Sequence, residues 1–266
     1  MRSVEGAVAV ITGAGSGIGR ATALSLARRG CAVVVSDLDV VRAQTVAAEI
    51  EDQGWRAASA KCNVANNDEV EALADSALSV FGRVDIVMSN VGIIAKGLPL
   101  EIPLEAWDSV FDVNVLGTVR VLQAFLPTLL EQGSGHVVTT ASTAGLFPYA
   151  FDRLPYASSK AAVVALSESL ALYLRPRGVG VTCFCPAGVM TNIVEQIREY
   201  GPPTPLQAPQ IPLITADAAA ELVVQGILRN QLLVLTDSEA EAMVERHSLD
   251  REGFLRTQIE YLEKAT

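Results

Sequence analysis

The sequence predicts an α/β fold, a single doubly wound domain with a seven-stranded, mainly parallel sheet and helices on both faces. Short apolar runs rich in β-branched residues alternate with stretches of helical period, and no Gly/Ser-rich linker or repeat interrupts them. This alternation is typical of βαβ units, whose parallel strands are buried on both faces. The chain has 266 residues, 50% of them hydrophobic, which is enough for one large core.

The expected elements follow the chain in order. Strands are predicted at 7–12, 31–37, 85–90, 136–142, 180–186 and 231–237, with a weaker candidate at 56–62. Helical periodicity covers 18–29, 40–53, 66–81, 105–131, 156–177 and 215–229. In open parallel sheets, ligands bind beyond the carboxyl ends of the strands, where the strand order reverses. Motifs at strand ends therefore have the most weight.

Two regions depart from the alternation. Residues 186–214 contain five prolines between Pro202 and Pro212, and a long irregular insertion of this kind is either a functional lid or disordered. Because it follows a strand end, we expect a substrate lid. Residues 238–266 are expected to form a C-terminal tail of one or two amphipathic helices.

Composition excludes several classes of protein. The formal net charge of −10 disfavours a nucleic-acid surface, because a negative chain repels phosphate. Four scattered cysteines do not form a disulfide framework, and with two histidines they give poor support for a metal site. No run of 18 apolar residues and no signal-peptide pattern occurs, so we expect no membrane span and a cytoplasmic location.

The first predicted strand runs into TGAGSGIG, residues 12–19, before a predicted helix. The run matches neither the GxGxxG fingerprint nor the Walker A pattern. Gly13 nevertheless permits a tight turn, and Gly17 and Gly19 allow a pyrophosphate and the helix to approach closely. The alternative is a strand–helix turn with spare glycines.

The second predicted strand ends at Asp37. A carboxylate at this place accepts hydrogen bonds from both adenosine ribose hydroxyls and repels a 2′-phosphate. No Lys or Arg occurs at 38–41 and residue 16 is Ser, so the sequence favours NAD over NADP. The alternative is an Asp that only caps the next helix.

Together and in order, TGAGSGIG (12–19), SNVG (89–92), Asn114, Ser142, Tyr156 with Lys160, and PAGVMT (186–191) resemble the short-chain dehydrogenase/reductase family in its Rossmann-type form of about 250 residues. The resemblance covers residues 5 to about 237. It implies that the catalytic residues are Asn114, Ser142, Tyr156 and Lys160. It implies cofactor contacts by Gly13, Ser16, Gly17, Ile18, Gly19, Asp37, Asn63, Val64, Asn90, Tyr156, Lys160, Pro186, Gly188, Val189 and Thr191. The sequence departs from the family's pattern at Asn63, at Ser89-Asn90-Val91-Gly92 and at Pro186-Ala187-Gly188.

The Tyr156–Lys160 pair predicts acid–base chemistry. A tyrosine has an ordinary pKa of about 10, too high for a base near pH 7. On a helix, Lys160 lies one turn beyond Tyr156 on the same face. An ammonium about 4–5 Å away is worth about 3–4 kcal/mol to the tyrosinate, which lowers the pKa by about two to three. The family resemblance adds Ser142 as a hydrogen-bond partner of the substrate oxygen, and Asn114 as the holder of a water in a proton relay.

The expected activity is NAD-dependent interconversion of a secondary alcohol and a ketone by hydride transfer. The residues expected to face the substrate are mostly apolar, which suggests a hydrophobic or alicyclic substrate: Ile93, Ile94, Leu146, Phe147, Tyr149, Met190 and Ile193. The alternatives are a 3-oxoacyl thioester reductase of the same family and a non-catalytic NAD-binding sensor. Apolar helices at 116–130 and 161–174, read with the family resemblance, predict a homotetramer built as a dimer of dimers.

Overall fold

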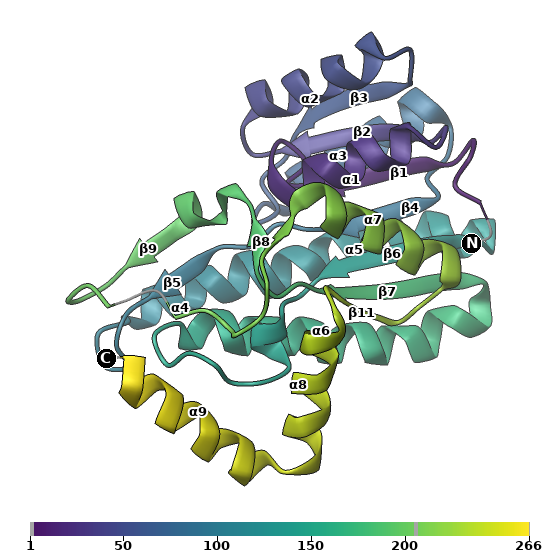
Figure 1. Ribbon diagram of the computed structural model, residues 1–266. Helices are drawn as coiled ribbons and strands as arrows, with labels where there is room; N and C mark the ends of the chain where they lie inside the picture. The colour runs from purple at the N-terminus through teal and green to yellow at the C-terminus, as the bar shows by residue number, and fades with distance from the viewer. Residues whose placement is uncertain (1–2, 205–206, 266) are drawn as a thin grey trace.

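Seven parallel strands form the central sheet of the computed structural model, which describes residues 3–204 and 207–265 (Figure 1). Every neighbouring pair in this sheet runs parallel, which confirms the predicted architecture. The strands lie in the order β11 (Leu233–Leu235), β7 (Val179–Cys185), β6 (Gly135–Thr140), β4 (Ile86–Ser89), β1 (Val8–Thr12), β2 (Ala32–Asp37) and β3 (Ala57–Lys61).

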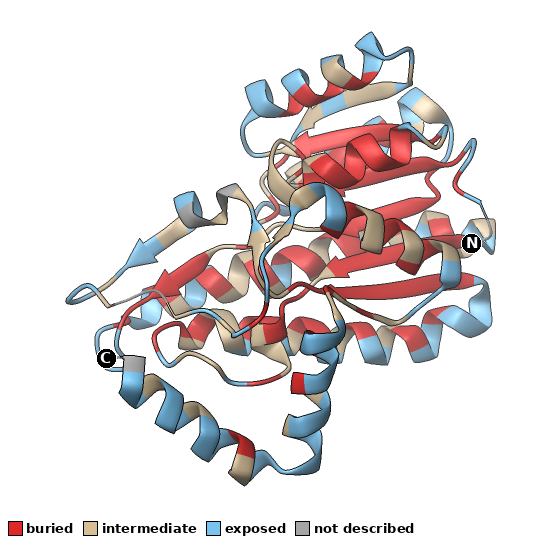
Figure 2. Cartoon of the chain, viewed as in Figure 1, coloured by how far each residue is buried: buried red, intermediate tan, exposed pale blue. Residues whose placement is uncertain are grey.

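Apolar side chains on both sides of the strands attach the two helical layers. In β1, Ile11 packs into the core on one face and Val10 into the core on the other. This explains why the strands are continuously apolar rather than alternating. The first face carries α1 (Gly17–Ala27), α2 (Val40–Asp52) and α7 (Ala216–Arg229). The second carries α3 (Asn67–Phe81), α5 (Gly117–Gln132) and α6 (Leu154–Leu174). Figure 2 shows the buried residues concentrated on the central strands and on the helix surfaces that face them.

The strand order reverses between β1 and β4, because β1 has β2 on one side and β4 on the other. The chain therefore leaves β1 and β4 in opposite directions, which opens a crevice beyond their carboxyl ends. The loops after β1, β2, β4, β6 and β7 all reach this edge of the sheet.

The predicted helix 105–131 is divided into three pieces: α4 (Leu104–Phe111), a π-helical turn η1 (Asp112–Leu116), and α5. Within the described residues, this stretch, Leu104–Gln132, is the one helix long and apolar enough by length and composition to cross a membrane. Val121, Phe125 and Leu129 of its α5 part pack into the sheet's core, so its apolar character has a structural explanation.

The segment 186–214 contains more regular structure than the sequence suggests; its residues 205–206 lie outside the described chain. It holds β8 (Val189–Met190), a short helix η4 (Asn192–Gln196), β9 (Ile197–Glu199) and β10 (Ile214–Thr215). β8 pairs with β10, and β9 pairs with β5 (Ile94–Lys96), in two small parallel sheets. The first pairing joins the two ends of the segment to each other, and the second attaches it to the strand that follows β4.

Two further helices, α8 (Ser238–Leu249) and α9 (Arg251–Ala265), form the C-terminal tail and project from the domain (Figure 1). Met243 and Phe254 pack with Phe147 in a small apolar cluster. Leu249 and Ile259 are exposed. The tail, for which the sequence predicts one or two helices, contains two helices among its described residues.

The four cysteines are free and buried. Cys183 and Cys185 lie on one face of β7 with their sulfur atoms 3.6 Å apart. Among the described residues, no group of three or more His, Cys, Asp or Glu side chains is arranged to hold a metal ion.

Candidate active site

A cleft of about 540 Å³ lies at the carboxyl edge of the sheet, where β1 and β4 diverge. This volume is in the usual range for small-molecule sites. Its lining brings together most of the residues that the sequence singled out: Gly13, Ser16, Gly17, Ile18, Asp37, Asn63, Val64, Asn90, Ser142, Tyr156, Lys160, Pro186, Val189, Thr191 and Ile193. Ile93 lines it as well.

The glycine loop opens the first side of the cleft. Gly13 and Gly17 have positive φ angles of 63° and 54°, and α1 begins at Gly17 with its amino end at the cleft. A Cβ on Gly19 would collide with the carbonyl oxygen of Gly13, so α1 approaches the loop as only glycine allows. A helix amino end beside open backbone is suited to a phosphate.

The sequence analysis predicts no role for Gly15, which lies between Gly13 and Gly17 in the same loop. Its N–H donates to Oδ2 of Asp37 at 2.9 Å. A Cβ at Gly15 would lie 2.8 Å from that oxygen and 2.7 Å from Cβ of Arg42. Gly15 therefore lets the end of β2 and the start of α2 approach the loop.

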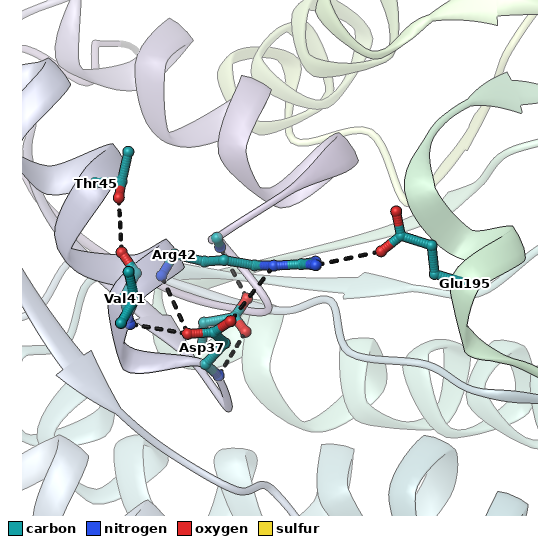
Figure 3. Close-up of polar contacts among 7 residues, drawn as sticks. Asp37, Val41, Arg42, Thr45 and Glu195 are labelled. Carbon is teal, nitrogen blue, oxygen red and sulfur yellow. Dashed lines mark hydrogen bonds and ion pairs between the residues drawn. The ribbon is translucent and has the colours of Figure 1, made fainter.

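Asp37 is held at the far end of the cleft by two backbone donors. Besides Gly15, the N–H of Asp39 donates to Oδ1 of Asp37 at 3.0 Å (Figure 3). Asp39 is the residue that caps α2, since it accepts from the N–H groups of Val41 and Arg42. The helix-capping role that was the alternative for Asp37 is thus filled by Asp39. Asp37 itself lines the cleft.

The expectation that no cation lies near the ribose position needs correction. Residues 38–41 contain no Lys or Arg, but Arg42 follows them directly and lines the cleft together with Asp37. Its guanidinium Nη2 lies 3.3 Å from Oε2 of Glu195 in η4, and its Nε lies 3.6 Å from Oδ2 of Asp39 (Figure 3).

Asn90 joins three strand ends at the centre of the cleft. Its amide nitrogen donates to the carbonyl oxygens of Thr12 and Gly13, and its N–H donates to the Thr12 hydroxyl. Its Oδ1 accepts from the hydroxyl of Thr140 at the end of β6. These bonds fix the spacing between the glycine loop and the end of β6.

Ser142, Tyr156 and Lys160 meet beyond β6. Ser142 follows that strand, and its Oγ accepts from the N–H of Ala144 at 3.2 Å. Tyr156 and Lys160 are one turn apart on α6, and Nζ of Lys160 lies 5.7 Å from the centre of the Tyr156 ring. Nζ also donates to the carbonyl oxygen of Thr140 at 2.7 Å.

Asn114 does not line the cleft but supports it from behind. It is fully buried in η1, where its Nδ2 donates to the hydroxyl of Ser159 and to the carbonyl oxygen of Ile93. Its Oδ1 accepts from the N–H of Ile93 at 2.8 Å. The Ser159 hydroxyl in turn donates to the main-chain oxygen of Tyr156. Asn114 thus connects the strand-end loop at Ile93 to α6, and π-helical turns often occur at functional sites.

The protonation of the pair differs from the expectation. Burial raises the pKa of Tyr156 above its ordinary value, while the Ser142 hydrogen bond and the charge of Arg153 act in the opposite direction. Burial lowers the pKa of Lys160 to about 8. The lowered Tyr156 pKa expected from Lys160 and the oxidised cofactor is thus not seen in the free cleft, because loss of hydration outweighs the Ser142 hydrogen bond and the Arg153 charge.

The residues proposed for substrate contact are divided between two places. Ile193 lines the main cleft, Ile94 is buried in β5, and Met190 is exposed. A second cavity of about 330 Å³ lies against the loop after β6 and the side of α6, and His247 of α8 also lines it. The other three residues lie there instead: Leu146, Phe147 and Tyr149.

Gly188 is also outside the lining, but its position is constrained, since a Cβ there would collide with Leu213. Pro186, at the start of the loop after β7, is fixed to the loop after β6, because its carbonyl oxygen accepts from the N–H of Thr143 at 3.0 Å.

Comparison with known proteins agrees with this geometry. Residues 7–201 match the family described as short chain dehydrogenase. The chain is 40% identical over 195 residues, 73% of its length, to the probable oxidoreductase EphD of Mycobacterium tuberculosis, of which it spans only 33%. It is 36% identical to a 3-oxoacyl-(acyl-carrier-protein) reductase of Synechocystis sp., with 74% of this chain and 80% of that protein covered. It is also 36% identical to a cyclohexanol dehydrogenase of Acinetobacter sp., with 72% and 76% covered.

Solved structures show the same fold over nearly the whole chain. A short chain dehydrogenase/reductase from Burkholderia phymatum in complex with NAD has a TM-score of 0.87 and 34% identity, over 95% of this chain and 96% of that one. An alcohol dehydrogenase from Thermococcus sibiricus complexed with 5-hydroxy-NADP has a TM-score of 0.74 and 28% identity, over 86% and 95%. The chain therefore belongs to the short-chain dehydrogenase/reductase family of oxidoreductases.

Proposed function

We propose that this oxidoreductase uses NAD to interconvert a hydrophobic or alicyclic secondary alcohol and the corresponding ketone. The observation that carries the proposal is the single cleft in which the glycine loop, Asp37, Ser142, Tyr156 and Lys160 meet. Two of these features suit a dinucleotide, and three suit proton transfer to or from a substrate oxygen.

The residues present fit a nicotinamide dinucleotide. The amino end of α1 and the space left by Gly17 and Gly19 suit its phosphates, and the carboxylate of Asp37 suits ribose hydroxyls. Asn63 and Val64 line the same cleft and are proposed to contact the adenine, and Pro186, Val189 and Thr191 to contact the nicotinamide. When bound, this cofactor accepts or supplies the hydride.

The chain's own side chains move the proton. In oxidation, the phenolate oxygen of Tyr156 removes the proton from the substrate hydroxyl as the carbon loses its hydride. In reduction, the Tyr156 hydroxyl returns that proton to the carbonyl oxygen. The buried ammonium of Lys160 and the hydrogen bond of Ser142 stabilise the charged forms. Because burial raises the Tyr156 pKa in the free cleft, efficient oxidation requires the positive charge of the oxidised cofactor nearby.

Asn114 is proposed to hold a water that links Lys160 to solvent. Its Oδ1 and Nζ of Lys160 both lie beside Gly92, at 3.6 Å and 3.1 Å from a Cβ built there. The absence of a side chain at Gly92 therefore keeps space open between the amide and the ammonium.

The substrate assignment rests on the apolar wall of the cleft, formed by Val91, Ile93, Ala187 and Ile193. A cyclohexanol dehydrogenase among the relatives supports an alicyclic alcohol. The second candidate, reduction of a 3-oxoacyl thioester, is favoured by the relative from Synechocystis sp.. The acidic net charge of −10 disfavours it, since an acidic carrier protein would be repelled.

Apolar residues left exposed on the helices support a homotetramer built as a dimer of dimers. Leu104 and Leu116 of the α4–α5 stretch and Leu172 and Tyr173 of α6 are all exposed. Burying such residues between subunits is favourable. Sedimentation at micromolar concentration tests this proposal, and a single species of 28.1 kDa contradicts it. A cytoplasmic location is proposed from the family's fold and the four reduced thiols, and recovery in the membrane fraction contradicts it.

The function is tested with purified protein, NAD⁺ or NADP⁺, and a panel of cyclic and linear secondary alcohols, measured as reduced cofactor formed. We expect turnover with NAD⁺ and apolar alcohols. Tyr156→Phe is expected to abolish turnover and leave NADH binding, followed by fluorescence, intact. Near-normal turnover in that variant contradicts the proton-transfer role, and NADH binding without turnover of any alcohol or ketone favours the sensor.

A further inference from the structure

An ion pair crosses the mouth of the cleft between segments that are 153 residues apart. Arg42 projects from the first turn of α2, and Glu195 lies in η4 after β8 (Figure 3). Their Nη2 and Oε2 atoms are 3.3 Å apart, and both side chains are about half exposed. Arg42, and Ile193 and Gln196 of η4, all line the cleft.

A second contact brings the same segment against the glycine loop. A Cβ built on Gly17 would lie 3.2 Å from Cβ of Thr191, just before η4. The segment from Thr191 to Gln196 therefore touches the loop at one point and α2 at another. Asp37 and Ser16 line the same cleft as this segment.

The charges around Arg42 determine what it can bind. Its guanidinium lies between the carboxylates of Asp39 and Glu195. Its Cβ and the carboxylate of Asp37 both approach Gly15. An arginine near the adenosine ribose is suited to a 2′-phosphate, through strong charge-assisted hydrogen bonds. A phosphate at this place would compete with Glu195 for Arg42.

We propose that Arg42 and Glu195 form a clasp that closes η4 over the adenosine end of the cofactor, and that Glu195 adds to the discrimination by Asp37 by keeping Arg42 from a 2′-phosphate. NAD leaves the clasp closed, whereas NADP binds Arg42 only if Glu195 is displaced. This inference rests on the proposed function, because it requires that the cleft bind a dinucleotide.

The test measures binding in addition to activity. NADH and NADPH affinities and NADH dissociation are followed by fluorescence in the wild type, in Glu195→Gln, in Arg42→Ala and in the double variant. Because half-exposed ion pairs are weak, we expect each single variant to release NADH about two- to fivefold faster. We expect Glu195→Gln to bind NADPH at least about fivefold more tightly, since Arg42 becomes available to the phosphate. Arg42→Ala should gain no NADPH affinity.

Two controls separate a clasp from a general change in surface charge. Glu49→Gln removes a comparable half-exposed carboxylate of α2, which pairs with Arg20 away from the cleft, and should change neither measurement. The double variant should release NADH no faster than either single variant, because both break the same interaction.

The proposal requires that Glu195→Gln both release NADH faster and bind NADPH more tightly, so the absence of either effect overturns it. Additive effects in the double variant, or equal effects of Glu49→Gln, also overturn it. A wild type that binds neither dinucleotide overturns the proposed function and this inference together. If the wild type binds NADH and Glu195→Gln changes neither NADH release nor NADPH affinity, the inference is overturned and the proposed function is not.

Discussion

Lys160→Met is expected to stabilise the protein while abolishing its catalysis. Lys160 is only 3% exposed, and its pKa falls from 10.5 to about 8. At about 1.4 kcal/mol for each tenfold change in proton affinity, keeping this ammonium charged at pH 7 costs the fold about 3 kcal/mol. Losing the bond from Nζ to the Thr140 carbonyl costs about 1 kcal/mol. Methionine is apolar and unbranched, so the net gain in unfolding free energy is about 2 kcal/mol at pH 7.

The pH dependence has a definite sign. Between pH 8 and 10.5 the unfolded chain binds more protons at Lys160 than the folded one, so the wild type gains stability as pH rises. The advantage of Lys160→Met should therefore shrink to under about 1 kcal/mol by about pH 9.5. Urea unfolding at a fixed protein concentration measures this difference at both pH values, with exposed Lys61→Met as the matched control. If Lys160→Met destabilises the protein at pH 7, or if its effect does not depend on pH, the reasoning is refuted.

Two other substitutions test the framework of the cleft. Gly19→Ala drives a methyl group into the carbonyl oxygen of Gly13 and should weaken NADH binding more than about tenfold, whereas Gly253→Ala in α9 should leave it unchanged; equal binding in both contradicts the packing argument. Asp85→Asn removes a buried carboxylate that pairs with the exposed guanidinium of Arg83 and accepts from the N–H of Val8. It should lower the unfolding free energy by about 1–3 kcal/mol in urea, and an unchanged midpoint contradicts this.

The main sheet was predictable because its strands are short, continuously apolar and separated by helical periodicity. Even the weak candidate at 56–62 corresponds to β3, which pairs in register with the end of β2. The sequence predicts one long helix at 105–131, where the structure has α4, η1 and α5. A π-helical turn adds a single residue to the helical spacing, so it leaves the apolar pattern almost unchanged. Asn114 was nonetheless identified, through the family resemblance rather than through periodicity.

The small strands of the segment 186–214 could not be predicted locally. β9 spans three residues and β8 only two, too few for a period of two to show. Their pairing depends on partners far along the chain, as when Ile94 of β5 meets Ile197 of β9. The same limit applies to Leu146 and Tyr149, since sequence position near Ser142 does not determine which of two cavities a loop residue lines.

The cofactor end of the site shows most clearly what a linear pattern omits. Asp37 was identified from its place at the end of β2, and its cation-free surroundings were inferred from the four residues that follow. Asp39 caps α2, which places Arg42 in the first turn, where it folds back beside Asp37 and Gly15. A carboxylate suited to NAD and a guanidinium suited to NADP thus both line the cleft near the end of β2. Whether the Asp37 carboxylate or the Arg42 guanidinium has the larger effect on cofactor binding depends on what neutralises Arg42. Its partner Glu195 comes from a distant segment of the chain. We therefore expect cofactor preference in this chain to depend on Glu195 as well as on the end of β2, as the proposed clasp requires.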